Sequence, residues 1–392
     1  MTIIMIGQKG LPARSGGIER HVQCLAEGLV SRGHRVVVFG RKWYVKNDAA
    51  PAGVEQVFSA GIHTKHLDAM THSFTALFRA RKYQPDVIHL HGVGIGLLAP
   101  FARLLHPRAK VIVTFHCLDR VFSKWGKLAR FAFRLGEILT CYTAHRTIVV
   151  SQYLLDYCLK TYGCQTAYIS HAFQIKEVSG SEKVPKAYGL EPNKYLLFVG
   201  RLLPHKGAHL LIKAFEMARD LRPDLFANIS LAIVGGGSWT DAYVQSLKKL
   251  ASTVPNVVLT GEIFGDDLRA VQAHALAHTF PTWEEGLSVA VLEAGVSGRP
   301  VVHTDLAPNM EAIGGNGIAV RTKDIPDLCR GLIQVVRMNE DERQLLAQVT
   351  RRHIEKQFSY DEGIDQVARL YREVCVGDRT LTTQVAVPSL SQ

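Results

Sequence analysis

Two glutamates in one short segment could hold a ligand rich in hydroxyl groups. Glu285 and Glu293 are separated by seven residues in the run 281–295, where the apolar pattern predicts a helix over Ser288–Val296. One carboxylate then lies in the loop before the helix, and the other lies one to two turns inside it. Both could accept hydrogen bonds from vicinal hydroxyls; alternatively, the helix dipole alone favours carboxylates there. An inward-facing Glu293 would be costly without a partner or a ligand.

Cations and glycines in two further loops could hold a diphosphate. Arg201 and Lys206 lie in the loop 199–207, and a guanidinium fork together with an ammonium suits phosphate oxygens. Gly16 and Gly17 precede a predicted helix, where free amides and the helix dipole favour an anion. Solvated surface cations and a tight turn are the alternatives. The glycine spacing matches neither GxGxxG nor a P-loop, so the glycine pair alone is a weak signal.

Histidines follow several predicted strands. His89 and His91 end one strand, and His116 follows another at the carboxyl edge, where parallel sheets bind their ligands. A single histidine at a strand end is more often structural than catalytic. Two histidines at i and i+2 without a carboxylate cluster do not indicate a metal site. The sequence contains no DxD motif, so a metal-diphosphate clamp of that kind lacks its ligands.

The segment 120–134 alternates basic and aromatic residues. This pattern fits an interfacial helix on anionic lipid, a rim around a substrate, or an ordinary packed amphipathic helix. The candidate membrane or acceptor contacts are Arg120, Lys124, Trp125, Lys127, Arg130 and Arg134.

The elements that must position these residues alternate between strands and helices. The first half predicts strands at 2–7, 35–39, 87–90, 111–115 and 147–150, with a helix at 18–32. The second half predicts strands at 195–199, 230–234, 257–260, 277–281 and 300–303, with helices at 208–221, 239–252, 266–273, 288–296 and 324–336. Such alternation indicates an α/β fold with two tandem Rossmann-like, doubly wound parallel sheets.

The breaks in this pattern divide the chain. We expect an amino-terminal domain over 1–172, a polar linker over 173–193 and a carboxy-terminal domain over 194–358. A closing helix over 359–376 is expected to return to the first domain, and the tail 377–392 to be disordered. Ligands of such folds bind at the carboxyl ends of the strands, so the two sheets should face one cleft.

The charge is concentrated in one half of the 392 residues, a length that fits two domains. Residues 1–185 hold 24 basic and 11 acidic residues, and the rest hold 22 basic and 24 acidic, so the first part carries +13 and the second −2 of the net charge of +11. An excess of positive charge in one half suggests an anionic partner, which could be a membrane surface, a nucleic acid or a phosphate-bearing substrate. The alternative is a solvated basic face. Hydrophobic residues at 47% and charged residues at 21% exclude disordered and collagen-like classes.

The cysteines and apolar runs indicate a cytosolic chain. Seven cysteines form no CxxC pair, and no leader-like segment precedes the first predicted strand. The most apolar stretch, 92–105, is too short to cross a bilayer and contains Arg103. A membrane would therefore be touched and not spanned.

The order of these motifs resembles the retaining glycosyltransferases of family 4, whose GT-B fold joins two Rossmann-like domains. The resemblance covers nearly the whole chain, and its most specific part is Glu-x7-Glu followed by Ala-Gly-Val-Ser-Gly-Arg-Pro-Val-Val. It also includes Gly-Gly-Ile-Glu-Arg-His at 16–21, Arg-Gly-His-Arg-Val at 32–36, Pro-Asp-Val-Ile-His at 85–89, Thr-Phe-His at 114–116 and Gly-Arg-Leu with Lys-Gly at 200–207.

The resemblance implies how the donor is held. Glu293 would bind the ribose hydroxyls of a nucleotide-diphosphate-sugar, and Glu285 would bind its sugar together with the amides of Gly286 and Leu287. His116 would contact the sugar near the reacting carbon.

It also implies how the leaving group is stabilised. Arg201 and Lys206 would neutralise the diphosphate, helped by the amides of Gly16 and Gly17. The nucleotide-sugar is then a co-substrate, with no cofactor and no metal. The family is thought to transfer with retention by front-face attack, so no residue is assigned as a covalent nucleophile.

Two features depart from the family or leave its details open. Many relatives carry Asn-Gly after the last strand of the first domain, where this chain has Ser170-His171-Ala172. The loop 261–267, on the expected base side, does not indicate whether uridine or guanosine is bound.

The sequence thus predicts a cytoplasmic enzyme, peripherally associated with the inner face of the membrane, that adds a sugar to a polysaccharide or lipid-linked glycan acceptor. The amino-terminal domain would face the acceptor and an anionic membrane surface, and nucleic acid is an unlikely partner. The alternatives are a GT-B nucleotide-sugar epimerase and a non-catalytic nucleotide-sugar-binding protein.

Overall fold

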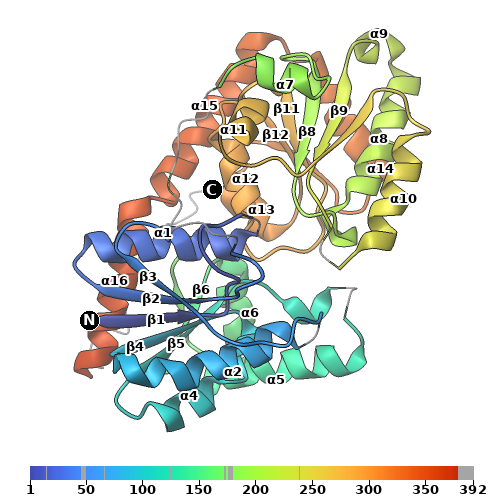
Figure 1. Ribbon diagram of the computed structural model, residues 1–392. Helices are drawn as coiled ribbons and strands as arrows, with labels where there is room; N and C mark the ends of the chain where they lie inside the picture. The colour runs from blue at the N-terminus through green and yellow to red at the C-terminus, as the bar shows by residue number, and fades with distance from the viewer. Residues whose placement is uncertain are drawn as a thin grey trace.

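The computed structural model describes residues 1–14, 16–45, 50–65, 67–122, 125–171, 174, 180–237 and 239–377. These residues form two α/β halves stacked on one another, each built around a parallel sheet (Figure 1). Separate apolar clusters pack on the two faces of each sheet, so both sheets are covered by helices on both sides. This arrangement confirms the predicted pair of doubly wound sheets.

The first sheet has the order β3-β2-β1-β4-β5-β6-β7. Its strands are β1 (Thr2–Ile6), β2 (Arg35–Gly40), β3 (Val54–Phe58), β4 (Val87–His91), β5 (Lys110–Phe115), β6 (Arg146–Val149) and β7 (Ala167–Tyr168). Its helices are α1 (Gly17–Ser31), α2 (Asp68–Ala80), η1 (Arg81–Tyr83), α3 (Val93–Gly96), α4 (Ala99–Leu105), η2 (Asp119–Val121), α5 (Lys127–Thr143) and α6 (Gln152–Tyr162). The apolar run of β1 suits its central place, where Ile4 pairs in parallel register with Val37 and Ile88.

The second sheet has the order β10-β9-β8-β11-β12-β13. Its strands are β8 (Tyr195–Val199), β9 (Ser230–Val234), β10 (Val257–Gly261), β11 (Ala277–Phe280), β12 (Val301–Thr304) and β13 (Ile318–Val320). The helices of this part of the chain are α7 (Lys183–Ala187), η3 (Pro204–Lys206), α8 (Ala208–Leu221), α9 (Pro223–Phe226), α10 (Asp241–Ala251), α11 (Gly265–Ala273), α12 (Val289–Gly295), α13 (Ala307–Ile313), α14 (Ile325–Arg337) and α15 (Glu340–Gln357). The last helix of the chain is α16 (Tyr360–Val376).

The segment that the sequence assigns to a linker is partly folded. Its residues 180–193 include α7, and Leu190 is fully buried against the second sheet. Residues 173 and 175–179 of the predicted linker lie outside the described residues, as do residue 172 before it and residues 378–392 of the predicted tail.

One apolar cluster is shared between the two halves. Phe115, Val149 and Leu154 from the first half belong to the same buried cluster as Leu287 and Leu292 from the second. The two sheets are therefore joined by a common core along the surface where they meet, which we call the seam.

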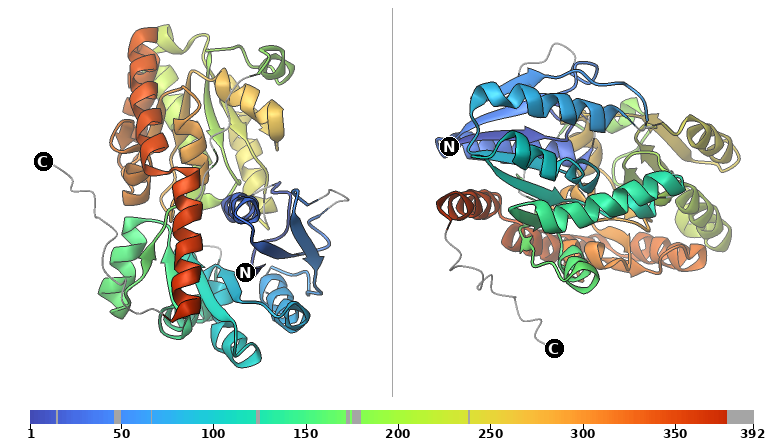
Figure 2. Two further views of the ribbon diagram at one scale, coloured as in Figure 1. Left: turned by 90° about the vertical axis from the view of Figure 1, so that its left-hand side faces the viewer. Right: turned by 90° about the horizontal axis from the view of Figure 1, so that it is seen from below.

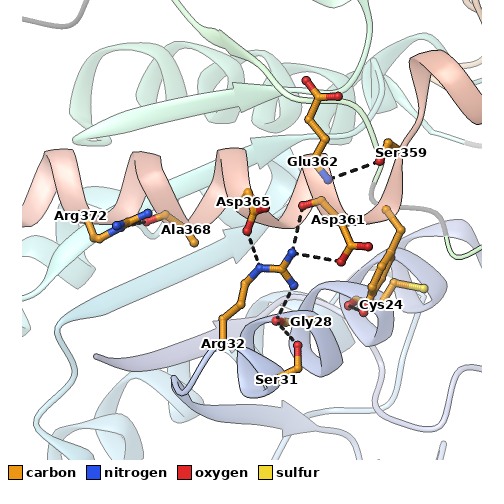
Figure 3. Close-up of polar contacts among 11 residues, drawn as sticks. Cys24, Gly28, Ser31, Arg32, Ser359, Asp361, Glu362, Asp365, Ala368 and Arg372 are labelled. Atoms are coloured by element: carbon orange, nitrogen blue, oxygen red, sulfur yellow. Dashed lines mark hydrogen bonds and ion pairs between the residues drawn. The ribbon is translucent and has the colours of Figure 1, made fainter.

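The last helix returns from the second half to the first. Figure 2 shows α15 and α16 following one another down one side of the molecule. Helix α16 packs beside α1, and Gly28 allows this approach because a Cβ there would lie 2.6 Å from Ile364 Cγ1. Arg32 donates to the carboxylates of Asp361 and Asp365, and the Tyr360 hydroxyl donates to the Cys24 carbonyl (Figure 3).

Candidate active site

Glu293 lies in α12 and faces α1 across the seam. Its Oε1 is 3.7 Å from Nε of Arg20, an ion pair between the two halves. Burial raises the pKa of the Glu293 carboxyl, and the Arg20 guanidinium opposes that shift. Arg20 is therefore the partner that a carboxylate on this apolar helix requires.

Glu285 lies in the loop before α12 and forms an ion pair with Lys206 of η3. The two side chains are only 13% and 18% exposed, so the pair is held away from bulk water. The sequence assigned Lys206 to a diphosphate and Glu285 to a sugar. Because the two side chains pair, the assigned diphosphate subsite and the assigned sugar subsite meet at one point.

Gly286 brings this loop into contact with the first half. A Cβ on Gly286 would lie 1.7 Å from the carbonyl oxygen of His116, so no side chain fits there. Gly17 also faces this segment, since a Cβ on it would be in ordinary van der Waals contact, 3.4 Å from Val289 Cγ2 at the start of α12. Leu287 is buried in the shared core. The fold therefore brings His116, Gly17 and the Gly286 loop together at the seam.

Arg201 and Lys9 lie close enough to repel one another. The pKa of the Lys9 ammonium is lowered, first by burial and then also by the charge of Arg201. The Lys9 amide donates to the carboxylate of Glu19 at 3.2 Å, and this carboxylate also crowds Gly16. Lys9 was missed in the sequence, although it follows β1 much as Arg201 follows β8. Both halves thus contribute a cation to this part of the seam.

Four buried histidines meet where the carboxyl edge of the first sheet reaches the seam. This histidine cluster consists of His21, His91, His116 and His171, from α1, the end of β4, the turn after β5 and the segment after β7. Nδ1 of His91 lies 3.3 Å from Nε2 of His116, and the His116 and His171 rings stack at 5.4 Å. Burial lowers the pKa of His116 well below its usual value, so its imidazole is neutral near neutral pH. His116 was the only one of the four assigned to the site from the sequence; His91 was named as a strand-end histidine, His171 as part of a departure from the family, and His21 as the end of the motif at 16–21.

A pocket of about 630 Å³ opens on the first half beside the ends of β2 and β3. We call it the Arg41 pocket. Arg41 pairs with Asp68 at 3.0 Å, and the Trp43 indole donates to the same carboxylate at 3.1 Å. The His63 ring lies tilted against that of Trp43, with centroids 4.2 Å apart, and against that of Trp239 of the second half, with centroids 5.4 Å apart. An aromatic bridge therefore crosses the seam next to the pocket.

The basic segment 120–134 divides into an inward and an outward part. Nε of Arg120 lies 3.1 Å from the fully buried Glu137, and its guanidinium also donates to Tyr157, so Arg120 stabilises a buried carboxylate. Its predicted contact with a membrane or an acceptor stays a prediction. Trp125 is partly buried, and its ring lies tilted against that of Phe133 with centroids 5.1 Å apart. The exposed cations are Lys127, Arg130 and Arg134, and Lys124 lies outside the described residues. Among the helices of the described residues, none is long and apolar enough to cross a membrane.

Two parallel α/β domains, with paired carboxylates and cations where their sheet edges meet, define the GT-B class of two-domain transferases. Residues 15–171 match the family described as "Glycosyltransferase Family 4", and residues 193–338 match "Glycosyl transferases group 1". The chain belongs to the family 4 glycosyltransferases of GT-B fold.

Known proteins of similar length support this membership. An uncharacterized glycosyltransferase of Methanocaldococcus jannaschii is 25% identical, over 95% of this chain and 98% of its own. The O-antigen chain mannosyltransferase C of Escherichia coli is also 25% identical, with the same shares of both chains. The fold is similar to that of sucrose-phosphate synthase from Thermosynechococcus elongatus, with a TM-score of 0.77, 20% identity and coverage of 96% and 99%. It is also similar to that of Anabaena HepE in complex with UDP and glucose, with a TM-score of 0.75, 17% identity and coverage of 95% and 100%.

Proposed function

We propose that this glycosyltransferase moves a sugar from a nucleotide-diphosphate-sugar to a polysaccharide or lipid-linked glycan, with retention and without a metal. The observation that carries the proposal is the contact of Gly286 with His116 beside the ion pair of Glu285 and Lys206. Groups that suit a sugar and groups that suit a phosphate therefore meet where the two domains touch.

In this mechanism the second domain holds the donor. Glu293 exchanges its contact with Arg20 for hydrogen bonds from the ribose hydroxyls. Glu285 accepts hydrogen bonds from the sugar hydroxyls, and the amides of Gly286 and Leu287 donate hydrogen bonds to the sugar. The neutral imidazole of His116 lies against the sugar near the reacting carbon.

The cations stabilise the leaving group. Glycosyl transfer builds positive charge on the sugar and releases a diphosphate, so fixed cations at the diphosphate lower the barrier. Arg201 and Lys206 take this role from the second domain, and the amides at Gly16 and Gly17 assist from the first. The departing phosphate oxygen accepts the proton of the acceptor hydroxyl, so neither a covalent nucleophile nor a cofactor is needed.

The acceptor approaches from the first domain. The Arg41 pocket presents the half-exposed Trp43 ring, and aromatic rings of this kind pack well against sugars. Related proteins are an O-antigen chain mannosyltransferase and a GDP-mannose-dependent phosphatidylinositol monomannoside mannosyltransferase, whose names describe glycan and lipid-linked acceptors. Helix α5 exposes Leu128 and Phe131 beside Lys127, Arg130 and Arg134, which suits contact with an anionic membrane at its cytoplasmic face.

A donor panel tests the proposal. Thermal stabilisation and slow sugar release are measured with UDP-, GDP-, ADP- and dTDP-sugars for wild type, Glu293→Ala and Arg201→Ala. Glu216→Ala and Arg337→Ala, at exposed positions in α8 and α14, are the matched controls. We expect one donor class to stabilise wild type and both controls, and to stabilise the two site variants much less. The proposal fails if no nucleotide-sugar stabilises the protein or if the site variants respond like the controls.

A further inference from the structure

The histidine cluster gathers more imidazoles than sugar binding uses. His21, His91, His116 and His171 are each no more than 5% exposed and come from four different elements. The ring centroid of His21 lies 5.9 Å from that of His91, 5.3 Å from that of His116 and 4.7 Å from that of His171. The proposed mechanism assigns a role to only one of these rings.

Each ring leaves one buried nitrogen without a partner among the described residues. These atoms are Nδ1 of His21, Nε2 of His91, Nδ1 of His116 and Nδ1 of His171. An unsatisfied buried polar atom costs about 1–3 kcal/mol, and natural structures contain few of them. Four such atoms in one cluster are unusual, and the two nitrogens of His91 and His116 that do have a partner, Nδ1 and Nε2, have only each other.

The spacing of the nitrogens suits a metal ion. One ring nitrogen from each of His21, His91 and His116 lies within 4.8 Å of the other two. Two imidazole nitrogens bound tetrahedrally at about 2.0–2.1 Å lie roughly 3.4 Å apart, and His91 Nδ1 and His116 Nε2 are separated by 3.3 Å.

The chemical form of the rings also suits a metal ion. Burial lowers the pKa of His21, His91 and His116 well below the usual value, so all three are neutral near neutral pH. Neutral imidazole is the ligand form of histidine. Behind them, His89 packs against His91 at 4.1 Å and is held by Tyr371 and Thr114, at 2.6 Å each. This support limits the movement of the His91 ring.

We propose that His21, His91 and His116, with His171 as a fourth neighbour, bind a borderline-soft divalent cation of the Zn²⁺ type. A site made of imidazoles selects zinc, nickel or copper over magnesium and calcium, which prefer oxygen. The consequence for catalysis rests on the proposed function, because a cation on His116 withdraws that imidazole from the sugar. The cation therefore inhibits transfer and takes no part in it.

The test uses full-length protein freed of metal with a chelator. Zn²⁺ alone is titrated by calorimetry, and Co²⁺ is used as a visible probe of tetrahedral coordination. We expect one equivalent of Zn²⁺ to bind, no response to Mg²⁺, and at least tenfold weaker Zn²⁺ binding in His21→Asn and His91→Asn. His209→Asn, which changes a partly buried histidine in α8, is the matched control and should bind Zn²⁺ like wild type.

The outcomes separate the metal site from the proposed function. Circular dichroism first shows whether each variant is folded. The Co²⁺ spectrum of wild type tests tetrahedral coordination even if a variant does not fold. Absence of stoichiometric Zn²⁺ binding, or equal binding by the two cluster variants and the control, overturns the metal site. The donor panel is run on the same metal-free protein, so donor binding can succeed or fail independently.

Discussion

At Gly286 the seam leaves no space for a side chain. Gly286→Ala would place a methyl group 1.7 Å from the His116 carbonyl oxygen and force the two loops apart. A displacement of about 1 Å between catalytic groups costs roughly 100-fold in rate, so we expect kcat for sugar transfer to fall at least that far. The measurement is the initial rate with saturating donor, alongside the thermal midpoint.

Gly126→Ala is the matched control for this substitution, because a Cβ on Gly126 meets no atom within 4 Å. Its rate should stay within twofold of wild type. An unchanged rate in Gly286→Ala would contradict the importance of this contact.

Arg120 shows how an ion pair can turn a basic residue inward. Arg120→Leu leaves the buried carboxylate of Glu137 with two tyrosine hydroxyls but no cation. We expect the free energy of unfolding to fall by about 3 kcal/mol, measured by urea denaturation. Adding Glu137→Gln to Arg120→Leu should recover part of the loss, because the amide carries no charge. A loss that the second substitution does not reduce would show that the charge is not its cause.

The sequence predicted residue types better than it predicted partners. Glu293, Lys206 and His116 were proposed because each lies in a recognisable motif, inside a helix or in a loop after a strand. Arg20 and His171 were missed as site residues because their partners lie far away in the chain. Arg120 was assigned to the surface because its interleaved pattern is the same whether a cation faces lipid or a buried carboxylate.

At the scale of elements, the contact of α1 with α16 depends on one small residue. Gly28→Ala would place a Cβ 2.6 Å from Ile364, and overpacking of this kind costs about 1–3 kcal/mol. The gain of about 1 kcal/mol in helix propensity offsets part of this cost. We expect a lower thermal midpoint by calorimetry, with Gly28→Ala plus Ile364→Val recovering stability. A midpoint above that of wild type would mean that the helices can separate at little cost.

Helix α5 carries the proposed membrane contact, with Leu128 and Phe131 83% and 67% exposed. Co-sedimentation with vesicles should increase with the fraction of anionic lipid and decrease with salt. The triple substitution Lys127→Gln/Arg130→Gln/Arg134→Gln should abolish the preference for anionic lipid. Lys213→Gln/Lys248→Gln/Lys249→Gln, on exposed positions of the second domain, should leave it intact. Equal, salt-insensitive binding to neutral and anionic vesicles would contradict an electrostatic contact.

The central strands, helix α1 and most helices of the second half were predicted to within a few residues, whereas α2 and α6 were missed. Strand β3 was missed because it is only partly buried and contains Glu55 and Gln56, and β7 because it has only two residues. Helix α15 was also missed, since most of its residues are polar. Its capping box of Asn339 and Glu342 was the signal that would have identified its start.

For the whole molecule, buried neutral histidines make stability depend on pH. Burial lowers the pKa of His72 and His171 to about 4, and that of His89 and His278 to about 3. These residues titrate near 6.5 in the unfolded chain, so below about pH 6.5 the unfolded state binds more protons. We therefore expect the free energy of unfolding to fall as pH decreases from about 6.5 towards 4.

Urea denaturation at several pH values in this window measures the effect. His171→Asn should show a shallower dependence than wild type, because one titrating group is removed. His274→Asn provides a control at a partly exposed position. Equal stability across the window would contradict the burial of neutral imidazoles.

The return of α16 to the first domain limits how such enzymes can be recombined. The first domain is built from two distant pieces of the chain, because Ile364 and Tyr371 complete the core around β1. A fragment ending at residue 171 would leave that part of its core open to water. In a chimera that combines the donor specificity of one relative with the acceptor specificity of another, residues 360–376 must therefore come from the same parent as the amino-terminal half.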